Sequence, residues 1–175
     1  PEQIQSLFDV DVFGVMNVTR EILPHFRFRK QGRIVNVTSL GGLIGIPMSS
    51  FYASAKWAVE GFSESLRFEL GELGIGLKIV EPGGVRTSFA DNAVVVSKPD
   101  VSSYEKAMQK RMENYESRRA RLNDPSVIAE VIYKAATDSG DRLRYIAGND
   151  ARVFWMLRQI LPFGLFTALL RRMSR

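Results

Sequence analysis

The chain has 175 residues, of which 45% are hydrophobic, enough for one globular domain with a core. It has no cysteine and one histidine, His25, which excludes disulfides, thiolate catalysis and multi-histidine metal sites, so no metal is expected. The net charge of +5 comes from residues 151–175, where five arginines stand without an acidic residue, and this argues against a nucleic-acid-binding surface.

Residues 2–28 carry apolar side chains at helical spacing, which predicts a helix at the start of the chain. Pro24 and the basic residues after it are predicted to end this helix. A β-branched run over residues 32–38 has the length of a strand. A glycine-rich loop over residues 40–47 follows, and composition typical of a helix returns over residues 49–73.

The second half of the chain repeats this alternation. A short strand is predicted over residues 77–80, and a Pro-Gly-Gly turn follows it. Residues 92–123 predict a loop and a charged helix. Asp124 is a suitable N-cap for a further helix with Pro125 at its first position, and a third strand is expected over residues 142–147.

Strands that alternate with helices predict an α/β fold, with a parallel sheet covered on both faces. Three strands are few for such a sheet, because both of its edges stay open. The opening helix also lacks the strand that should lead into it. We therefore expect residues 1–175 to be the second half of a doubly wound parallel sheet whose first half precedes Pro1.

Three polar side chains are expected to meet at one edge of this sheet. Tyr52 and Lys56 are four residues apart, which places a phenol and an ammonium group on one face of a helix. Ser39 stands at the end of the preceding strand. Because ligands bind open α/β sheets outside the carboxyl ends of the strands, we expect all three side chains at one crevice.

This combination suits proton transfer coupled to hydride transfer. Reduction of a carbonyl builds an alkoxide that needs a proton, and the reverse reaction needs a base. A tyrosine that titrates near ~10 needs a shift of about three units, or roughly 4 kcal/mol, to act near neutral pH. One cation about 4 Å away supplies about that much at an effective dielectric of about 20, and Lys56 is the candidate.

Three motifs occur in order along the chain: Asn36-Val37-Thr38-Ser39, Tyr52-x-x-x-Lys56 and Pro82-Gly83-x-Val85-x-Thr87. Together they resemble the short-chain dehydrogenase/reductase family, over nearly the whole length of the chain. The resemblance implies a single NAD(P)-binding Rossmann-like domain over residues 1–175, truncated at its N-terminus. It also implies reversible hydride transfer between NAD or NADP and a small-molecule alcohol or carbonyl.

The resemblance also implies roles for individual residues. Tyr52 would be the acid and base, and Ser39 would polarise the carbonyl group. Lys56 would lower the pKa of Tyr52 and bond the nicotinamide ribose. The nicotinamide and its adjoining phosphate would be lined by the turn residues Pro82, Gly83, Val85 and Thr87.

Asp11 departs from the family pattern, which usually has asparagine at this position to help hold a water in the proton relay to the lysine. Aspartate is nearly isosteric, so a relay through its backbone carbonyl can survive. Alternatively, its charge pairs with Lys56 and weakens the pull on Tyr52. The family's glycine-rich dinucleotide loop would precede Pro1, and Gly41-Gly42-x-x-Gly45 does not replace it.

Asp11 and the absent first half leave a second interpretation open, a non-catalytic binding or scaffold protein on the same fold. For an enzyme, apolar residues near the site favour a hydrophobic substrate. These residues are Leu43, Ile44, Met48, Phe51 and Phe89. Apolar side chains on more than one face of residues 51–70 indicate core packing or, by the resemblance, a homo-oligomer interface shared with the opening helix.

Residues 151–175 form an apolar, basic C-terminal tail, and its Pro162 and Gly164 make it a poor membrane span. We expect the tail to close over the substrate as a lid or to pack on a partner subunit. Contact with an anionic membrane surface is the alternative. With no leader in the sequence and no cysteine, cytoplasmic localisation is expected.

Overall fold

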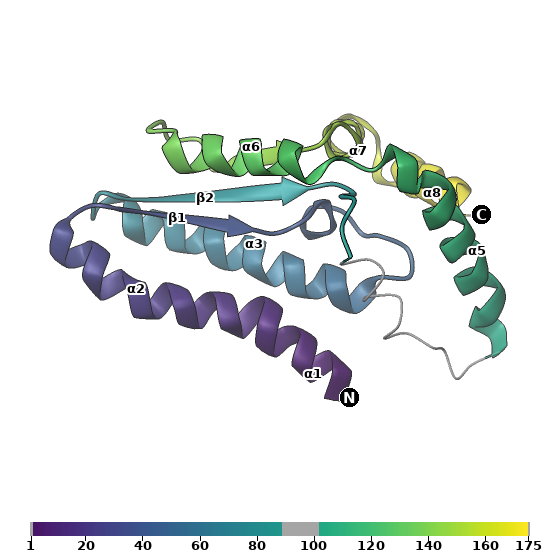
Figure 1. Ribbon diagram of the computed structural model, residues 1–175, viewed down its shortest axis with the longest axis horizontal. Helices are drawn as coiled ribbons and strands as arrows, with labels where there is room; N and C mark the ends of the chain where they lie inside the picture. The colour runs from purple at the N-terminus through teal and green to yellow at the C-terminus, as the bar shows by residue number, and fades with distance from the viewer. Residues whose placement is uncertain (1, 89–101, 175) are drawn as a thin grey trace.

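The computed structural model describes residues 2–88 and 102–174. Its centre is a parallel sheet of β1 (Gly32–Val37), β2 (Ile75–Pro82) and β3 (Arg144–Ala147), in the order β1-β2-β3. Helices cover both faces of this sheet (Figure 1). The predicted α/β fold with a parallel sheet is confirmed.

Two helices, α2 (Val15–Arg29) and α3 (Ser50–Gly71), lie on one face of the sheet, and α6 (Pro125–Thr137) lies on the other (Figure 1). The core under α2 and α3 contains Ile34, Leu66 and Ile79, against which Leu23 and Phe26 of α2 pack. The opposite core joins α6 to the sheet. Its buried members are Val80, Ile128, Ala135, Tyr145 and Ala147.

The opening helical segment has nearly the predicted bounds but is less regular than the sequence predicted. It consists of α1 (Glu2–Phe8), a π-helical stretch η1 (Asp9–Gly14) and α2. The helix ends among the basic residues after Pro24, as predicted, whereas Pro24 itself lies inside α2 and does not end it. Packing of α2 on the core outweighs the single hydrogen bond that a proline cannot donate. The helix ends at Lys30, which adopts a left-handed conformation with φ of 50°.

The other predicted elements differ mainly at their ends. Strand β2 extends beyond the predicted residues 77–80 at both ends, because its pairing with β1 begins at Ile75. Strand β3 is shorter than predicted, since its pairing with β2 begins at Arg144. The charged region contains α5 (Ser102–Arg118) and the short helix η3 (Arg119–Arg121). The predicted cap of α6 is confirmed, because the Asp124 carboxylate accepts a hydrogen bond from the Ser126 backbone N–H.

The C-terminal tail folds into α7 (Asn149–Ile160) and α8 (Phe163–Ser174). Both helices pack on the loop that follows β1 and contains the short helix η2 (Leu40–Gly42). Phe166 is 2% exposed there, in a cluster with Ala151 and the loop residue Ile44. The tail thus packs on its own chain, a contact that the sequence did not predict.

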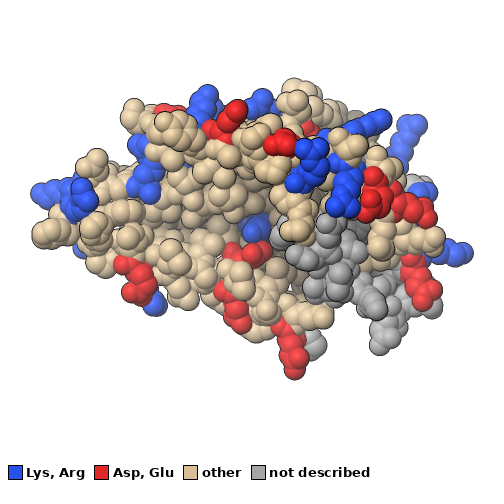
Figure 2. Space-filling model, in the orientation of Figure 1, with Lys and Arg blue, Asp and Glu red and all other residues tan. Residues whose placement is uncertain are grey.

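Within the described residues, no helix is both long enough and apolar enough to span a membrane. Acidic and basic side chains are interspersed over the face drawn in Figure 2.

Candidate active site

The carboxyl ends of β1 and β2 lie side by side and define the edge at which the predicted residues meet. The register pairs Val37 with Val80, and the Thr38 backbone N–H donates to the Val80 carbonyl over 2.9 Å. Ser39 therefore leaves β1 at the edge where Pro82 ends β2. This is the edge at which open α/β sheets bind ligands.

Ser39 is held by the turn that begins after it. Its side chain caps η2, because Oγ accepts a hydrogen bond from the Gly41 backbone N–H over 3.1 Å. Ser39 and Tyr52 are also hydrogen-bonded to each other through their side chains. A Cβ atom at Gly41 would lie 3.2 Å from Cε1 of Tyr52, so glycine lets the turn sit against the tyrosine ring.

Tyr52 and Lys56 occupy the first two turns of α3. The chain enters this helix through Met48, whose φ of 59° turns the backbone before Ser49. The Lys56 Nζ lies 5.6 Å from the centroid of the Tyr52 ring. The structure thus brings Ser39, Tyr52 and Lys56 together, with the serine bonded to the tyrosine and the lysine beside its ring.

Asp11 reaches the same place from the π-helical stretch. Its Oδ2 lies 3.2 Å from the Nζ of Lys56, with the two side chains 21% and 14% exposed respectively. Packing of Val12 against Ala55 and Val59 fixes η1 against α3. Of the two alternatives that the sequence left open for Asp11, the ion pair with Lys56 is present.

The environment of Tyr52 makes it a weaker acid than a free tyrosine. Burial raises its pKa above the ordinary value of 10.0, the hydrogen bond with Ser39 lowers it, and the charge of Asp11 raises it further. The sequence led us to expect that Lys56 lowers the pKa of Tyr52, whereas the sum of these effects raises it. The physical reason is that burial dominates, while the Asp11 carboxylate offsets the charge of the lysine.

The turn after β2 carries the other predicted residues. Pro82 is buried at the end of the strand, and the Gly83 backbone N–H donates to the Ala147 carbonyl of β3 over 2.9 Å. Val85 forms an isolated parallel bridge with Asn123, and the exposed Thr87 donates its N–H to the Val85 carbonyl over 3.0 Å. These residues lie at the same sheet edge as Ser39, on the side of β3.

Two residues that the sequence analysis did not single out hold this turn. Asp150, in the first turn of α7, accepts a hydrogen bond from the Gly84 backbone N–H over 2.7 Å. Asn123 donates its side-chain amide to the Gly84 carbonyl over 2.7 Å. The partners are 66 and 39 positions apart in the chain, and no local pattern in the sequence signals such contacts.

A buried charge cluster adjoins Thr38, the residue before Ser39. The Thr38 hydroxyl donates to the Glu60 carboxylate, and Arg144 lies 3.4 Å from Glu60 and 3.6 Å from Glu81. Glu81 is completely buried, and burial raises its pKa to about 8, with the nearby Glu60 carboxylate adding to the increase. No local pattern in the sequence indicates this cluster, because Glu60, Glu81 and Arg144 stand far apart in the chain.

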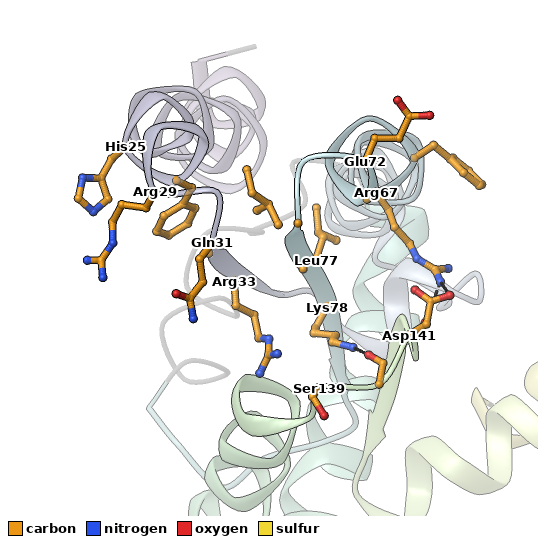
Figure 3. Close-up of a pocket in the computed structure, with 18 residues that line it drawn as sticks. His25, Arg29, Gln31, Arg33, Arg67, Glu72, Leu77, Lys78, Ser139 and Asp141 are labelled. Atoms are coloured by element: carbon orange, nitrogen blue, oxygen red, sulfur yellow. Dashed lines mark hydrogen bonds and ion pairs between the residues drawn. The ribbon is translucent and has the colours of Figure 1, made fainter.

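A cavity of about 1010 Å³ lies at the opposite, amino ends of the strands. Figure 3 shows its basic lining residues. Two of them are already held by the chain: Lys78 donates to the Arg142 carbonyl over 2.8 Å, and Arg67 donates to the Asp141 carbonyl over 2.7 Å. This cavity is separate from the edge that carries Ser39 and Tyr52.

The chain is similar to known oxidoreductases over nearly all of its length. The family model described as short chain dehydrogenase matches residues 1–96. An uncharacterized oxidoreductase of Schizosaccharomyces pombe is 38% identical over 172 residues, which cover 98% of this chain and 72% of the relative.

Two solved structures share the fold. A short-chain dehydrogenase from Streptomyces avermitilis has a TM-score of 0.75 and 28% identity, over 98% of this chain and 60% of that one. A 3-oxoacyl-[acyl-carrier protein] reductase with bound NAD from Brucella melitensis has a TM-score of 0.62 and 26% identity, over 83% and 50% of the two chains. The chain thus spans about half to three fifths of these structures, and it belongs to the short-chain dehydrogenase/reductase family.

Proposed function

We propose that this chain carries the catalytic half of an oxidoreductase that transfers a hydride between NAD or NADP and an alcohol or carbonyl substrate. The observation that carries the proposal is the side-chain hydrogen bond between Ser39 and Tyr52, with Lys56 beside the tyrosine ring. The membership of the family supports the same class of reaction.

Each residue has a role that follows from its chemistry. Tyr52 donates a proton to the alkoxide that forms during reduction, and its raised pKa keeps the phenol protonated at neutral pH. Ser39 donates a hydrogen bond to the substrate oxygen and so stabilises the negative charge that develops there. Lys56 holds the nicotinamide ribose, and Asp11 restrains the lysine through their ion pair.

The residues present at the site fit a nicotinamide dinucleotide, which supplies or accepts the hydride when it is bound. Lys56 and Tyr52 offer polar hydrogens, and the turn from Pro82 to Thr87 approaches the same edge from the neighbouring strand. Within this turn Gly83 and Val85 are partly accessible, and Thr87 is exposed. The Brucella melitensis reductase, which shares this fold, has NAD bound.

The test is the substitution Tyr52→Phe in the full-length native polypeptide. We expect turnover of a panel of apolar aldehydes and alcohols to fall at least about a thousandfold, while NADH or NADPH still binds. Tyr133→Phe is the matched control, because Tyr133 is 72% exposed on α6. Full activity of Tyr52→Phe would overturn the assignment.

The second candidate function is a non-catalytic binding or scaffold protein on the same fold. It is favoured by one observation, the ion pair that ties Lys56 to Asp11 and leaves Tyr52 without a lowered pKa. The same substitution discriminates the two candidates. A scaffold keeps its function when Tyr52 loses its hydroxyl, whereas an enzyme loses turnover.

A hydrophobic substrate remains part of the proposal, on a smaller set of residues than the sequence indicated. Leu43 and Ile44 are buried against the tail, so they line the protein core. Met48 and Phe51 are 45% and 54% exposed at the entrance to α3 and support the proposal. Phe89 lies outside the described residues.

We also propose that residues 1–175 form a single domain and that the protein is a homo-oligomer. Large apolar side chains on α2 and α3 face solvent, among them Val18 at 71%, Trp57 at 51% and Phe68 at 74%. Such a surface is typical of a subunit interface. A mass from light scattering that stays monomeric at all concentrations of the native polypeptide would contradict this part.

Contact of residues 151–175 with an anionic membrane surface stays a prediction. Val153, Met156 and Ile160 are about half exposed or more, and their spacing places them on one side of α7. Arg158 lies between them in the sequence and packs over the Phe163 and Phe166 rings. Co-sedimentation of the native polypeptide with anionic liposomes tests this contact, with Ile160→Glu as the variant that should abolish it.

A further inference from the structure

We propose that Asp150 is a positioning residue that sets the affinity for the dinucleotide by fixing the turn from Pro82 to Thr87. This inference rests on the proposed function and extends it to a residue outside the Ser-Tyr-Lys group. Asp150 belongs to α7, and its carboxylate reaches back to the turn after β2.

The carboxylate of Asp150 uses both of its oxygens. Oδ2 accepts a hydrogen bond from the Gly84 backbone N–H over 2.7 Å, and Oδ1 accepts one from the Asn123 side-chain amide over 2.8 Å. Asn123 in turn donates to the Gly84 carbonyl from its side-chain amide over 2.7 Å and from its backbone N–H over 3.0 Å. Both backbone polar groups of Gly84 are thus bonded to other segments.

Close packing accompanies these hydrogen bonds. A Cβ atom at Gly83 would lie 2.2 Å from Oδ1 of Asp150, and one at Gly148 would lie 2.6 Å from Nδ2 of Asn123. Glycine at these two positions is what allows the carboxylate and the amide to fit between the turn and α7. The φ of +97° at Gly148 likewise favours glycine where the chain enters this helix.

We call the hydrogen bonds that join Asp150 and Asn123 to Gly84 the clamp. The position of α7 links this clamp to the Ser39 side of the site. Ala151, the next residue after Asp150, is buried in the cluster that holds the loop after Ser39. One helix therefore contacts both the loop after Ser39 and the turn assigned to the cofactor. A turn held in advance loses less conformational freedom when a ligand binds, which increases affinity.

The experiment compares Asp150→Ala with Asp138→Ala in the full-length native polypeptide. Asp138 is the matched control, because it also accepts a hydrogen bond from a glycine N–H over 2.7 Å, that of Gly140, at the opposite end of the sheet. Binding of NADH and of NADPH is measured by fluorescence titration, and hydrogen exchange over residues 82–87 is measured without dinucleotide.

For Asp150→Ala we expect faster exchange over residues 82–87 and a dissociation constant about tenfold higher, with kcat at saturating dinucleotide within about threefold of wild type. Asp138→Ala should lower thermal stability without either change. Asn123→Ala should weaken dinucleotide binding in the same direction as Asp150→Ala, since it removes another side of the clamp.

An Asp150→Ala variant that is folded and binds the dinucleotide like wild type overturns the inference, whether or not hydrogen exchange over residues 82–87 becomes faster. An equal loss of dinucleotide affinity in Asp150→Ala and Asp138→Ala also overturns the inference, because the loss would then reflect general stability. A wild-type polypeptide that binds neither NADH nor NADPH instead overturns the proposed function, and this inference with it. The two failures are therefore distinguishable.

Discussion

The Nζ of Lys56 lies 3.2 Å from the Oδ2 of Asp11, so the lysine beside the tyrosine is paired with a carboxylate. The pair joins the π-helical stretch to α3. Because both side chains are only partly exposed, salt screens their attraction less than that of a fully exposed pair. The negative charge of Asp11 also raises the pKa of Tyr52, though less than burial does. Asp11 thus acts against the use of Tyr52 as a base.

Replacement of this carboxylate should increase alcohol oxidation. For Asp11→Asn in the full-length polypeptide, we expect the rising limb of the pH–rate profile to move to lower pH. The oxidation rate at pH 7 should increase about threefold or more, because the Tyr52 pKa loses one of the influences that raise it. Asp9→Asn is the control, since Asp9 accepts a hydrogen bond from the exposed Gln5 instead. A lower rate for Asp11→Asn would contradict this prediction.

The buried Glu81 should make the protein less stable as pH rises from about 4.5 to about 8. Its pKa is about 8 in the folded chain and ordinarily 4.5, so the folded state retains a proton that the unfolded chain releases. The stabilisation is complete below pH 4.5 and is lost as pH rises to about 8. The raised pKa of Glu60 acts in the same direction.

Urea unfolding at pH 5, 6.5 and 8 measures this dependence. Glu81→Gln should flatten it, because the amide cannot ionise. Glu64→Gln is the control, since Glu64 also pairs with Arg144 but its side chain is 53% exposed. Equal slopes for wild type and Glu81→Gln would show that Glu81 is ionised throughout this range.

Phe166 should contribute much more to stability than Phe163 of the same helix. Phe166 is 2% exposed in the cluster that anchors the tail on the Leu40 loop, whereas Phe163 is 67% exposed. We expect Phe166→Ala to lower the free energy of unfolding by about 3–5 kcal/mol, and Phe163→Ala by less than about 1 kcal/mol. Chemical denaturation monitored by circular dichroism checks both values, and similar losses would mean that the tail does not pack through Phe166.

Two glycine substitutions should have opposite effects. Gly61→Ala lies in an exposed part of α3 with no atom within 4 Å of the new Cβ, so it should stabilise the protein by about 0.5–1 kcal/mol. Gly83→Ala would place its Cβ 2.2 Å from the Asp150 carboxylate and should destabilise the turn. Thermal melts and dinucleotide titrations of both variants measure this contrast, and a neutral Gly83→Ala would argue against the close packing at this turn.

Local spacing made several features predictable from the sequence. Tyr52 and Lys56 share a helical face because they are four residues apart, and Asp124 caps α6 because Pro125 begins that helix. The position of Ser39 at the sheet edge followed from the length of the strand before it. Each of these features depends on a few neighbouring residues, which is why sequence patterns indicate them.

The sequence by itself determined the alternation of strands and helices, and with it the parallel sheet and the edge that carries Ser39 and Tyr52. Only the tertiary structure decided that Asp11 pairs with Lys56, that Asp150 holds Gly84 and that the tail packs on the Leu40 loop. These contacts join residues far apart in the chain. Their formation depends on how the helices pack on the sheet, and the periodicity of a single segment carries no information about that packing.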